Sequence, residues 1–313
     1  MDDVKLWLKG TNYKECKISI ASTDASFRSY YRLKCLKKSY ILMDASLEKN
    51  TLKPFVDITK RLLSVDVKAP SIFEEDFKRG YLVLEDFGTI NLLDKLTNDN
   101  FKIYYKKAIA EIVKMQKADV SKLAIYDKSF LHFEMNLMQE WYLEKRLSLK
   151  LTNKQNKMLV NTLDKISTIV LSQPQNIFVH RDFHSRNIML TPIDELGVID
   201  YQDGMSGALT YDLVSLLKDC YISFPREDIL ILALEFKKRA DIGVSDKEFI
   251  KWFDFMGMQR HIKVLGIFSR LYIRDKKDGY LKDIPLTLNY TIETAKLYDE
   301  TKELAQFLEE FCL

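Results

Sequence analysis

The chain has 313 residues, 47% of them hydrophobic and 30% charged, a composition typical of a folded globular protein. Lys and Arg number 48 against 45 Asp and Glu, giving a formal net charge of +3, which is too even a balance to indicate nucleic-acid binding. The length accommodates two packed lobes or one large domain.

The first residues, MDDVKLWLKG, contain two acids and lack the basic segment and long apolar run of a secretory signal. No stretch approaches the ~18 apolar residues that span a membrane. We therefore expect a cytoplasmic protein without membrane contact. The four cysteines form no CxxC pair, which predicts buried thiols in a reducing compartment and no zinc or catalytic site. They are Cys16, Cys35, Cys220 and Cys312.

Residues 1–88 predict a small, mostly antiparallel lobe. A short opening helix precedes β-rich segments, among them CKISIAS, YYRLKCLKK, SYILMDAS and YLVLED. Between the third and fourth strands, residues 47–63 place apolar side chains at helical spacing, with Pro54 in the first turns, where proline is tolerated. We expect residues 1–88 to form an N-terminal nucleotide-binding lobe that consists of a sheet and one helix.

Residues 89–313 predict a larger, mainly helical lobe that carries catalysis and substrate binding. Only NIFVH, NIMLT and LGVIDY interrupt the helical periodicity as strand candidates. The fold class is therefore α+β with two lobes. The predicted helices cover residues 100–117, 130–147, 153–171, 211–222, 227–240, 246–272 and 292–311.

The segment HRDFHSRNIML, residues 180–190, contains the motif that points most directly to chemistry. Asp182 is followed five residues later by Asn187, and Asp200 arrives thirteen residues after that in GVIDYQD. Phosphoryl transfer needs a carboxylate for the attacking hydroxyl and oxygen ligands for Mg²⁺ on the nucleotide. We predict Asp182 as the base and Asn187 with Asp200 as metal ligands. A solvated turn is the alternative for HRD alone, but not for the whole pattern.

A second kinase-like tripeptide, DFG at residues 86–88, occurs too early in the chain. In protein kinases the metal-binding DFG follows the catalytic loop, whereas here it precedes HRD by more than ninety residues. An apolar strand that ends in a glycine turn is typical of a hinge between lobes. We expect Glu85 and Phe87 to bind adenine there, while Asp86 is equally well an ordinary strand end.

These segments resemble the aminoglycoside phosphotransferase-like small-molecule kinases, and within them the N-acetylmuramate/N-acetylglucosamine anomeric kinases of cell-wall recycling. The resemblance extends from about residue 23 to residue 285. Its blocks are TDASFRSYYRL, ILMDAS, YLVLEDFG, HRDFHSRNIML, IDYQDGMSGALTYDLVSLLKDCYISFP and DFMGMQRHIKVLGIFSRLYIRDKKDGYLKDIP. It implies a kinase-like fold and transfer of a phosphoryl group from ATP, with Mg²⁺, to the C1 hydroxyl of an N-acetylated amino sugar.

The resemblance also implies roles for further residues. Asp203 would be a second acidic residue of the site or a structural acceptor, and Asp212 would open a helix and steady the catalytic loop. The turn that closes over the nucleotide phosphates would contain Ser26, Phe27 and Arg28.

The third strand, YILMD, departs from the wider superfamily because it lacks the lysine that holds the α- and β-phosphates. We expect Arg28 to supply the phosphate-binding cation. Arg32 is the alternative, and it is equally compatible with a surface charge on its strand.

The acceptor site is the part that the sequence defines least. Arg260, Lys263, Arg270 and Arg274 share one helix face and suit the lactyl carboxylate of N-acetylmuramate, although a solvated basic face is the commoner explanation. Gln259, Arg260 and His261 are the candidate sugar contacts, with an interior histidine as the alternative for His261. For a polycationic antibiotic the chain offers three acids that are also ordinary surface residues, namely Glu134, Glu140 and Glu144.

Two other functions stay open from the sequence. One is a kinase for another small hydroxyl substrate, such as an aminoglycoside, choline or homoserine. The other is a non-catalytic nucleotide-binding scaffold, which the missing lysine favours and the retained base and metal ligands disfavour. A protein kinase is disfavoured because no activation loop or APE segment separates Asp200 from the helix that begins near Tyr211.

Overall fold

A computed structural model describes residues 2–22, 28–36 and 38–312. The described chain forms two compact units. Unit 1 comprises residues 1–94 and 186–204, and unit 2 comprises residues 95–185 and 205–313. Residues 186–204 thus group with the N-terminal residues, and the sequence-based boundary after residue 88 stays a prediction.

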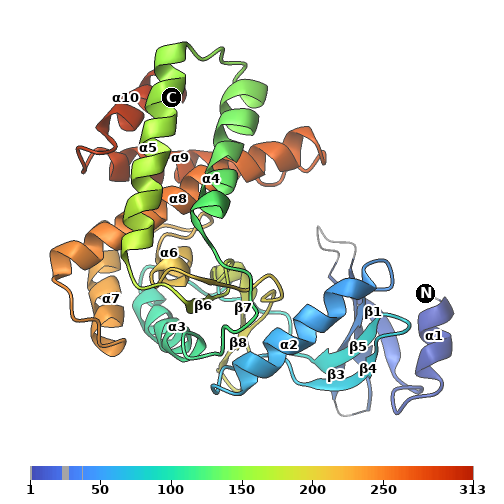
Figure 1. The fold of residues 1–313 in the computed structure, drawn as a ribbon. Coiled ribbons are helices and arrows are strands. Elements are labelled where there is room, and N and C mark those ends of the chain that lie inside the picture. Colours follow the sequence, from blue (N-terminus) through green and yellow to red (C-terminus); the bar gives the residue numbers. More distant parts are fainter. Residues whose placement is uncertain (1, 23–27, 37, 313) are drawn as a thin grey trace. The chain divides into compact units, whose positions relative to one another are not determined.

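Unit 1 is built on a five-stranded sheet in which every neighbouring pair is antiparallel (Figure 1). The strand order is β1-β2-β3-β5-β4, and α2 lies between β3 and β4 in the sequence. This arrangement confirms the predicted small antiparallel lobe with one helix. The elements are α1 (Asp2–Leu8), β1 (Lys17–Ser22), β2 (Ser29–Lys34), β3 (Ser39–Asp44), a 3₁₀ turn (Lys49–Thr51), α2 (Leu52–Leu63), β4 (Ile72–Asp76) and β5 (Tyr81–Glu85).

Apolar side chains at regular spacing hold α1 and α2 in unit 1. Val4 and Leu8 of α1 lie in one core cluster with Leu33, Leu42 and Val83 from the strands. The buried face of α2 includes four large apolar residues, Phe55, Val56, Ile58 and Leu62. Burying side chains of this size contributes about 1.5–3 kcal/mol each relative to exposure.

Cys16 and Cys35 form a disulfide across the β1–β2 pair. Lys17 pairs with Lys34, so the next two residues outward are these cysteines, and their Cα atoms lie 4.4 Å apart. The prediction that the cysteines are free thiols is therefore wrong for Cys16 and Cys35. They lie 19 residues apart in the sequence, and only the register of the two strands brings them together. Cys220 is a buried free thiol, as predicted, and Cys312 is a partly buried one.

A short hairpin completes unit 1 and places the residues around the predicted metal site. It pairs β7 (Ile188–Leu190) with β8 (Leu196–Val198), antiparallel, with Ile188 opposite Val198. Beyond that last pair, the Ile199 N–H donates to the Asn187 carbonyl at 3.1 Å. The antiparallel register therefore brings Asn187 and the following Asp200 to the same end of the hairpin.

Unit 2 is organised around one long helix, α8, whose contacts include α4, α5, α6, α7 and α9 (Figure 1). Eighteen of its 28 residues are buried. No helix of the described chain is long and apolar enough to cross a membrane. The elements are α3 (Phe101–Met115), α4 (Lys128–Leu137), a π-helical stretch (Met138–Arg146), α5 (Asn153–Ser172), β6 (Ile177–Val179), β9 (Met205–Gly207), α6 (Tyr211–Leu217), α7 (Arg226–Arg239), α8 (Asp246–Ile273), a 3₁₀ turn (Leu281–Asp283), α9 (Ile284–Ala295) and α10 (Lys302–Cys312).

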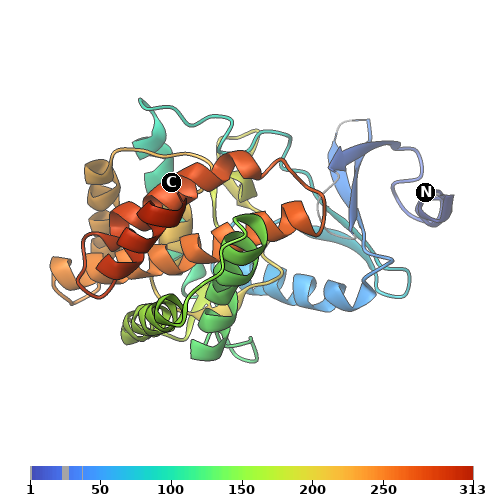
Figure 2. The ribbon, with the colours of Figure 1, turned by 90° about the horizontal axis from the view of Figure 1, so that it is seen from above.

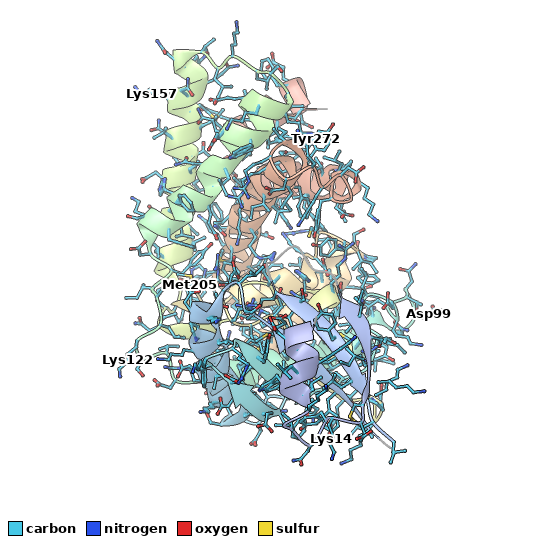
Figure 3. The ribbon with its side chains drawn as sticks, turned by 90° about the vertical axis from the view of Figure 1, so that its right-hand side faces the viewer. Lys14, Asp99, Lys122, Lys157, Met205 and Tyr272 are labelled. Atoms are coloured by element: carbon cyan, nitrogen blue, oxygen red, sulfur yellow. A yellow bond between two sulfur atoms is a disulfide. The ribbon has the colours of Figure 1, made fainter. Side chains whose placement is uncertain are left out.

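The prediction of one helix over residues 292–311 is wrong. Two helices replace it, because α9 begins at Ile284, with Pro285 in its first turn, and ends at Ala295 before α10 starts at Lys302. The Thr301 hydroxyl bonds the Ala295 carbonyl and so caps the end of α9 within the connecting turn. Figure 2 shows both helices, in orange-red and red, and α9 contacts both α8 and α10.

Candidate active site

Unit 1 contains a cavity of about 330 Å³ that the sheet, α2 and the β7–β8 hairpin line together. Its walls are largely apolar, with Ile41, Phe55, Leu84 and Met189 among them, and its polar groups include Asn187 and Asp200. An apolar slot with a few polar groups is the usual form of a site for a planar ring with a charged tail. The size and polarity suit a purine nucleotide.

Asn187 and Asp200 form the polar end of this cavity. The Asn187 Nδ2 donates to Asp200 Oδ2 at 3.2 Å, and Gln202 donates to Asp200 Oδ1 at 2.9 Å. Asp200 has a φ of 64°, a strained conformation for a residue with a side chain. The carboxylate and amide oxygens are hard ligands of the kind that Mg²⁺ prefers. The described residues contain no cluster of three metal-ligating side chains, so phosphate and water oxygens would complete the coordination.

The segment from Glu85 to Gly88 lines the same cavity. The Asp86 side chain is 2% exposed and accepts two hydrogen bonds from the Arg32 guanidinium, at 2.7 and 3.0 Å. Arg32 also donates to the Gly88 carbonyl at 2.8 Å. Burial would raise the pKa of Asp86, but its bonds to Arg32 and its neighbours lower it below the usual value. Asp86 is therefore not an ordinary strand end: through Arg32, its buried carboxylate holds the segment from Glu85 to Gly88 in place. We call the Arg32–Asp86 pair the clamp.

Neighbouring residues of unit 1 hold the side chains of Glu85 and Phe87, the residues predicted to bind adenine. The Glu85 carboxylate accepts hydrogen bonds from Lys68 at 2.8 Å and from the Ser71 hydroxyl at 2.9 Å. The Phe87 ring lies directly against Gly197, where any side chain would collide with it. Both side chains thus contact other residues of unit 1. The backbone groups of this segment are therefore the candidates for hydrogen bonds to a ring in the cavity.

In unit 2, the loop that follows β6 holds Asp182 in a strained backbone. Arg181 has a φ of 78°, a conformation that costs about 1–3 kcal/mol for a residue with a side chain. The buried Asp212 carboxylate, in the first turn of α6, accepts the N–H groups of His180 at 2.7 Å and Arg181 at 3.0 Å. Asp212 therefore opens a helix and steadies the loop, as the sequence predicted.

Cationic side chains surround Asp182 on its own unit. The Arg260 guanidinium lies 3.9 Å from Asp182 Oδ1, and 45% of the Asp182 side chain stays exposed. Burial would raise the pKa of Asp182, but the charge of Lys263, with Arg260 and Arg181, outweighs it and lowers the pKa to about 2. Asp182 is therefore ionised at neutral pH and can accept a proton.

Glu134 of α4 is the buried counter-ion for these cations. Its carboxylate accepts from Arg181 at 2.8 Å, lies 2.9 Å from the Lys263 ammonium and also bonds the Tyr126 hydroxyl. A buried acid with so many donors fixes the cations in place, because removing one partner would leave uncompensated charge. Glu134 is thus no surface acid, whereas Glu140 and Glu144 are exposed, so the three do not form an acidic pocket.

The pattern of the phosphotransferase enzyme family matches residues 17–241. The chain belongs to this family. A relative from Neisseria meningitidis, an N-acetylmuramate/N-acetylglucosamine kinase, is 37% identical over 98% of this chain and 94% of its own. A second kinase of that name, from Pseudomonas aeruginosa, is 35% identical over 92% of this chain and 86% of its own. This phosphotransferase is an ATP-dependent small-molecule kinase.

A solved structure, an ethanolamine kinase from Plasmodium vivax, has the same fold as this phosphotransferase. The TM-score is 0.65 at 12% identity, over 91% of this chain and 85% of that one. The likeness confirms the predicted two-lobed, kinase-like α+β fold class.

Arg32 contacts the nucleotide-type cavity of this phosphotransferase, and Arg28 is not among its lining residues. Arg28 is buried and donates to the Thr51 hydroxyl at 3.3 Å. The surface-charge alternative for Arg32 was wrong, because its side chain is only 15% exposed and bonds Asp86. Ser26 and Phe27 lie outside the described residues. The Arg32–Asp86 pair could not be predicted from the sequence, since 54 residues separate its members.

The residues predicted to contact the acceptor differ in exposure. Gln259, Arg260 and His261 are at most 3% exposed, and all three bond protein groups: Gln259 bonds Tyr126 and Glu134, Arg260 the Arg181 carbonyl, and His261 the Lys218 carbonyl. Burial lowers the pKa of His261 to about 3, so it is a neutral interior histidine. This burial favours a supporting role for all three. Asp203 is exposed beside Gln202 in unit 1, and its role stays a prediction.

The basic strip on α8 is not the solvated face that its sequence suggested. Arg260 and Lys263 are buried around Asp182 and Glu134, Arg270 is partly buried, and Arg274 is exposed and bonds Asp275. Only the last part of the strip therefore behaves as a solvated face.

Lys263→Met is expected to move the acid limb of the pH–rate profile upward. With a pKa of about 2, Asp182 stays ionised throughout the range from about pH 4 to about pH 8, so the wild type shows no loss of the base there. Removing Lys263, the strongest of the opposing charges, raises that pKa, and activity then begins to fall at a higher pH. The measurement is kcat/KM for the acceptor at saturating MgATP. Arg274→Met, at the exposed end of the same helix, should keep the wild-type profile. Identical pH–rate profiles for the wild type, Lys263→Met and Arg274→Met would contradict the assignment of Asp182 as the base.

Arg32→Met is expected to raise KM for ATP about tenfold while KM for the acceptor stays unchanged. The substitution leaves the buried Asp86 charge without its guanidinium and frees the Gly88 carbonyl, so the cavity wall loosens. The control is Arg79→Met, which breaks an Arg–Asp pair on the surface of the same unit, where Arg79 is 58% exposed and the pair contributes little. Equal ATP affinity in both variants would show that the clamp does not shape the nucleotide site.

Proposed function

We propose that this kinase transfers the γ-phosphoryl group of ATP to the C1 hydroxyl of N-acetylmuramate or N-acetylglucosamine, in recycling of the bacterial cell wall. The observation that carries the proposal is the 35–37% identity to two kinases of that name along 92–98% of the chain. ATP as donor also places the reaction in the cytoplasm, where ATP is available.

Asp182 is the proposed base in this reaction. As the C1 oxygen attacks the γ-phosphorus, its proton passes to the Asp182 carboxylate, the bond to the β-phosphate oxygen breaks and ADP leaves. A hemiacetal hydroxyl is more acidic than other sugar hydroxyls, so an ordinary carboxylate is a sufficient base. The low pKa of Asp182 keeps its carboxylate deprotonated in the resting state, where Arg260 and Lys263 compensate its charge.

Asn187 and Asp200 are the proposed Mg²⁺ ligands. The ion, when bound, would neutralise charge on the transferring phosphoryl group. Asn187 follows Asp182 by five residues in the sequence. Positioning and charge neutralisation would then supply most of the rate enhancement.

A substrate panel tests the proposal. ADP release is measured with MgATP and each of N-acetylmuramate, N-acetylglucosamine, kanamycin and choline. We expect turnover with one or both amino sugars and none with the two cationic compounds, because the buried acid Glu134 is already paired with Arg181 and Lys263 and is not available to bind them. Turnover with kanamycin or choline alone would refute the sugar assignment, and turnover with none of the four would also refute it and indicate a kinase for another small hydroxyl substrate.

A further inference from the structure

Four aromatic rings of unit 2 form a continuous series that starts two residues after Asp182. We call His184, Tyr221, Phe268 and Tyr280 the aromatic strip. The centroids of His184 and Tyr221 lie 5.2 Å apart with their planes at 84°, those of Tyr221 and Phe268 6.4 Å apart at 33°, and those of Phe268 and Tyr280 5.2 Å apart at 29°. The strip therefore leads from the catalytic loop past α8 to the turn before α9.

Asp219 fixes the strip to the catalytic loop. This carboxylate is 1% exposed; one oxygen accepts the N–H of Ser185 at 2.9 Å and also its hydroxyl, and the other accepts the N–H of Tyr221 at 3.0 Å. The His184 N–H donates to the Asp182 carbonyl at 2.9 Å. Tyr221 and His184 thus share a rigid frame with the proposed base, as a wall that orients a substrate requires.

The exposure of the strip differs from that of a core cluster. Phe268 is 4% exposed and packs as an interior ring, whereas His184, Tyr221 and Tyr280 each keep part of their surface open. Core packing accounts for Phe268, whereas His184, Tyr221 and Tyr280 remain partly exposed beside the loop that contains Asp182. Partly exposed aromatic side chains held on a catalytic loop are typical of ligand sites.

The chemistry of the strip suits an uncharged or anionic sugar ring. A pyranose has an apolar C–H face that packs on a flat aromatic ring, while its hydroxyl rim stays available to polar groups. Three of the four acids around the loop, Glu134, Asp212 and Asp219, are at most 3% exposed and accept hydrogen bonds from protein groups. They are therefore not available to bind a polycationic acceptor, whereas Arg260 and Lys263 lie close to Asp182 and Glu134.

We propose that the aromatic strip binds the pyranose ring of the acceptor, with Tyr221 as its principal stacking surface. This inference rests on the proposed function, since it takes an amino sugar as the acceptor. It assigns a binding role to residues that the sequence did not single out as acceptor contacts.

The test compares Tyr221→Leu, Tyr221→Phe and Tyr104→Leu in steady-state kinetics with N-acetylglucosamine and N-acetylmuramate. Tyr221→Leu removes the flat ring and should raise KM for the sugar about five- to tenfold, equivalent to about 1.0–1.4 kcal/mol, with kcat and KM for ATP nearly unchanged. Tyr221→Phe keeps the ring and should restore the wild-type KM. Tyr104→Leu, on α3 of the same unit, should match the wild type.

The outcomes separate this inference from the function on which it rests. If the wild type phosphorylates an amino sugar and Tyr221→Leu has an unchanged KM for it, the strip does not bind the acceptor although the function holds. If Tyr221→Leu lowers kcat and raises KM for ATP as much as for the sugar, Tyr221 is only structural and the inference is wrong. A wild type that turns over no amino sugar contradicts the proposed function itself.

Discussion

Asp182→Asn is expected to lower kcat by about a thousandfold while ADP binding persists. The amide has the size of the carboxylate but cannot take the proton of the attacking hydroxyl, and general-base catalysis contributes about 10²–10⁴-fold. The nucleotide-type cavity lies in unit 1, so its lining is unchanged. The measurement is kcat by ADP release, with ADP affinity determined by calorimetry.

The matched control for this variant is Asp164→Asn on α5 of the same unit. Asp164 is 51% exposed and pairs with Lys128 of α4, so the same change of charge occurs in an exposed ion pair on another element. It should leave kcat within about twofold of the wild type. Full activity in Asp182→Asn would remove Asp182 from the mechanism, and loss of ADP binding or of the thermal transition would show that the variant is damaged in its fold.

Asp200→Asn is expected to lower kcat by about a hundredfold or more at low Mg²⁺, with partial recovery as Mg²⁺ rises. Replacing the carboxylate by an amide removes one negative charge from the proposed metal site, where Asn187 is the other ligand. The measurement is activity as a function of Mg²⁺ concentration at fixed ATP. A loss of activity that Mg²⁺ cannot relieve at any concentration would favour a purely structural role.

Asp194→Asn provides the control for this second prediction. Asp194 is exposed in the turn between β7 and β8 and has a φ of 60°, a conformation that Asn adopts as readily as Asp. It removes one charge from the same hairpin without touching the cavity lining. Its Mg²⁺ dependence should equal that of the wild type. If Asp194→Asn and Asp200→Asn shift the dependence equally, general charge accounts for the effect and the ligand assignment is wrong.

The parts of the site that could be predicted are those encoded by short spacing. Asn187 and Asp200 lie at the same end of one hairpin, so their local sequence determines that the two side chains meet, whereas their proposed role and that of Asp182 stay predictions. The strands of unit 1 alternate regularly, and the helix between residues 47 and 63 has a clear apolar face, so both were recognisable.

The parts that could not be predicted depend on contacts between distant segments. Glu134 resembles any acid on a helix surface until α8 supplies Lys263, and the loop supplies Arg181, as buried partners. Arg260 and Lys263 likewise resemble a solvated face, because helical periodicity cannot distinguish a charge that faces water from one that faces an opposite charge. The Cys16–Cys35 disulfide depends on the register of two strands.

The fate of the sugar's reducing end tests the proposed reaction most directly. Phosphorylation at C1 converts the hemiacetal into a glycosyl phosphate, which no longer reduces an oxidant, whereas a phosphate on any other hydroxyl leaves the reducing end intact. Incubation of N-acetylmuramate or N-acetylglucosamine with MgATP and the enzyme should therefore consume one reducing end for each ADP released, and Asp182→Asn should show neither change. ADP release with the reducing end fully retained would contradict transfer to C1.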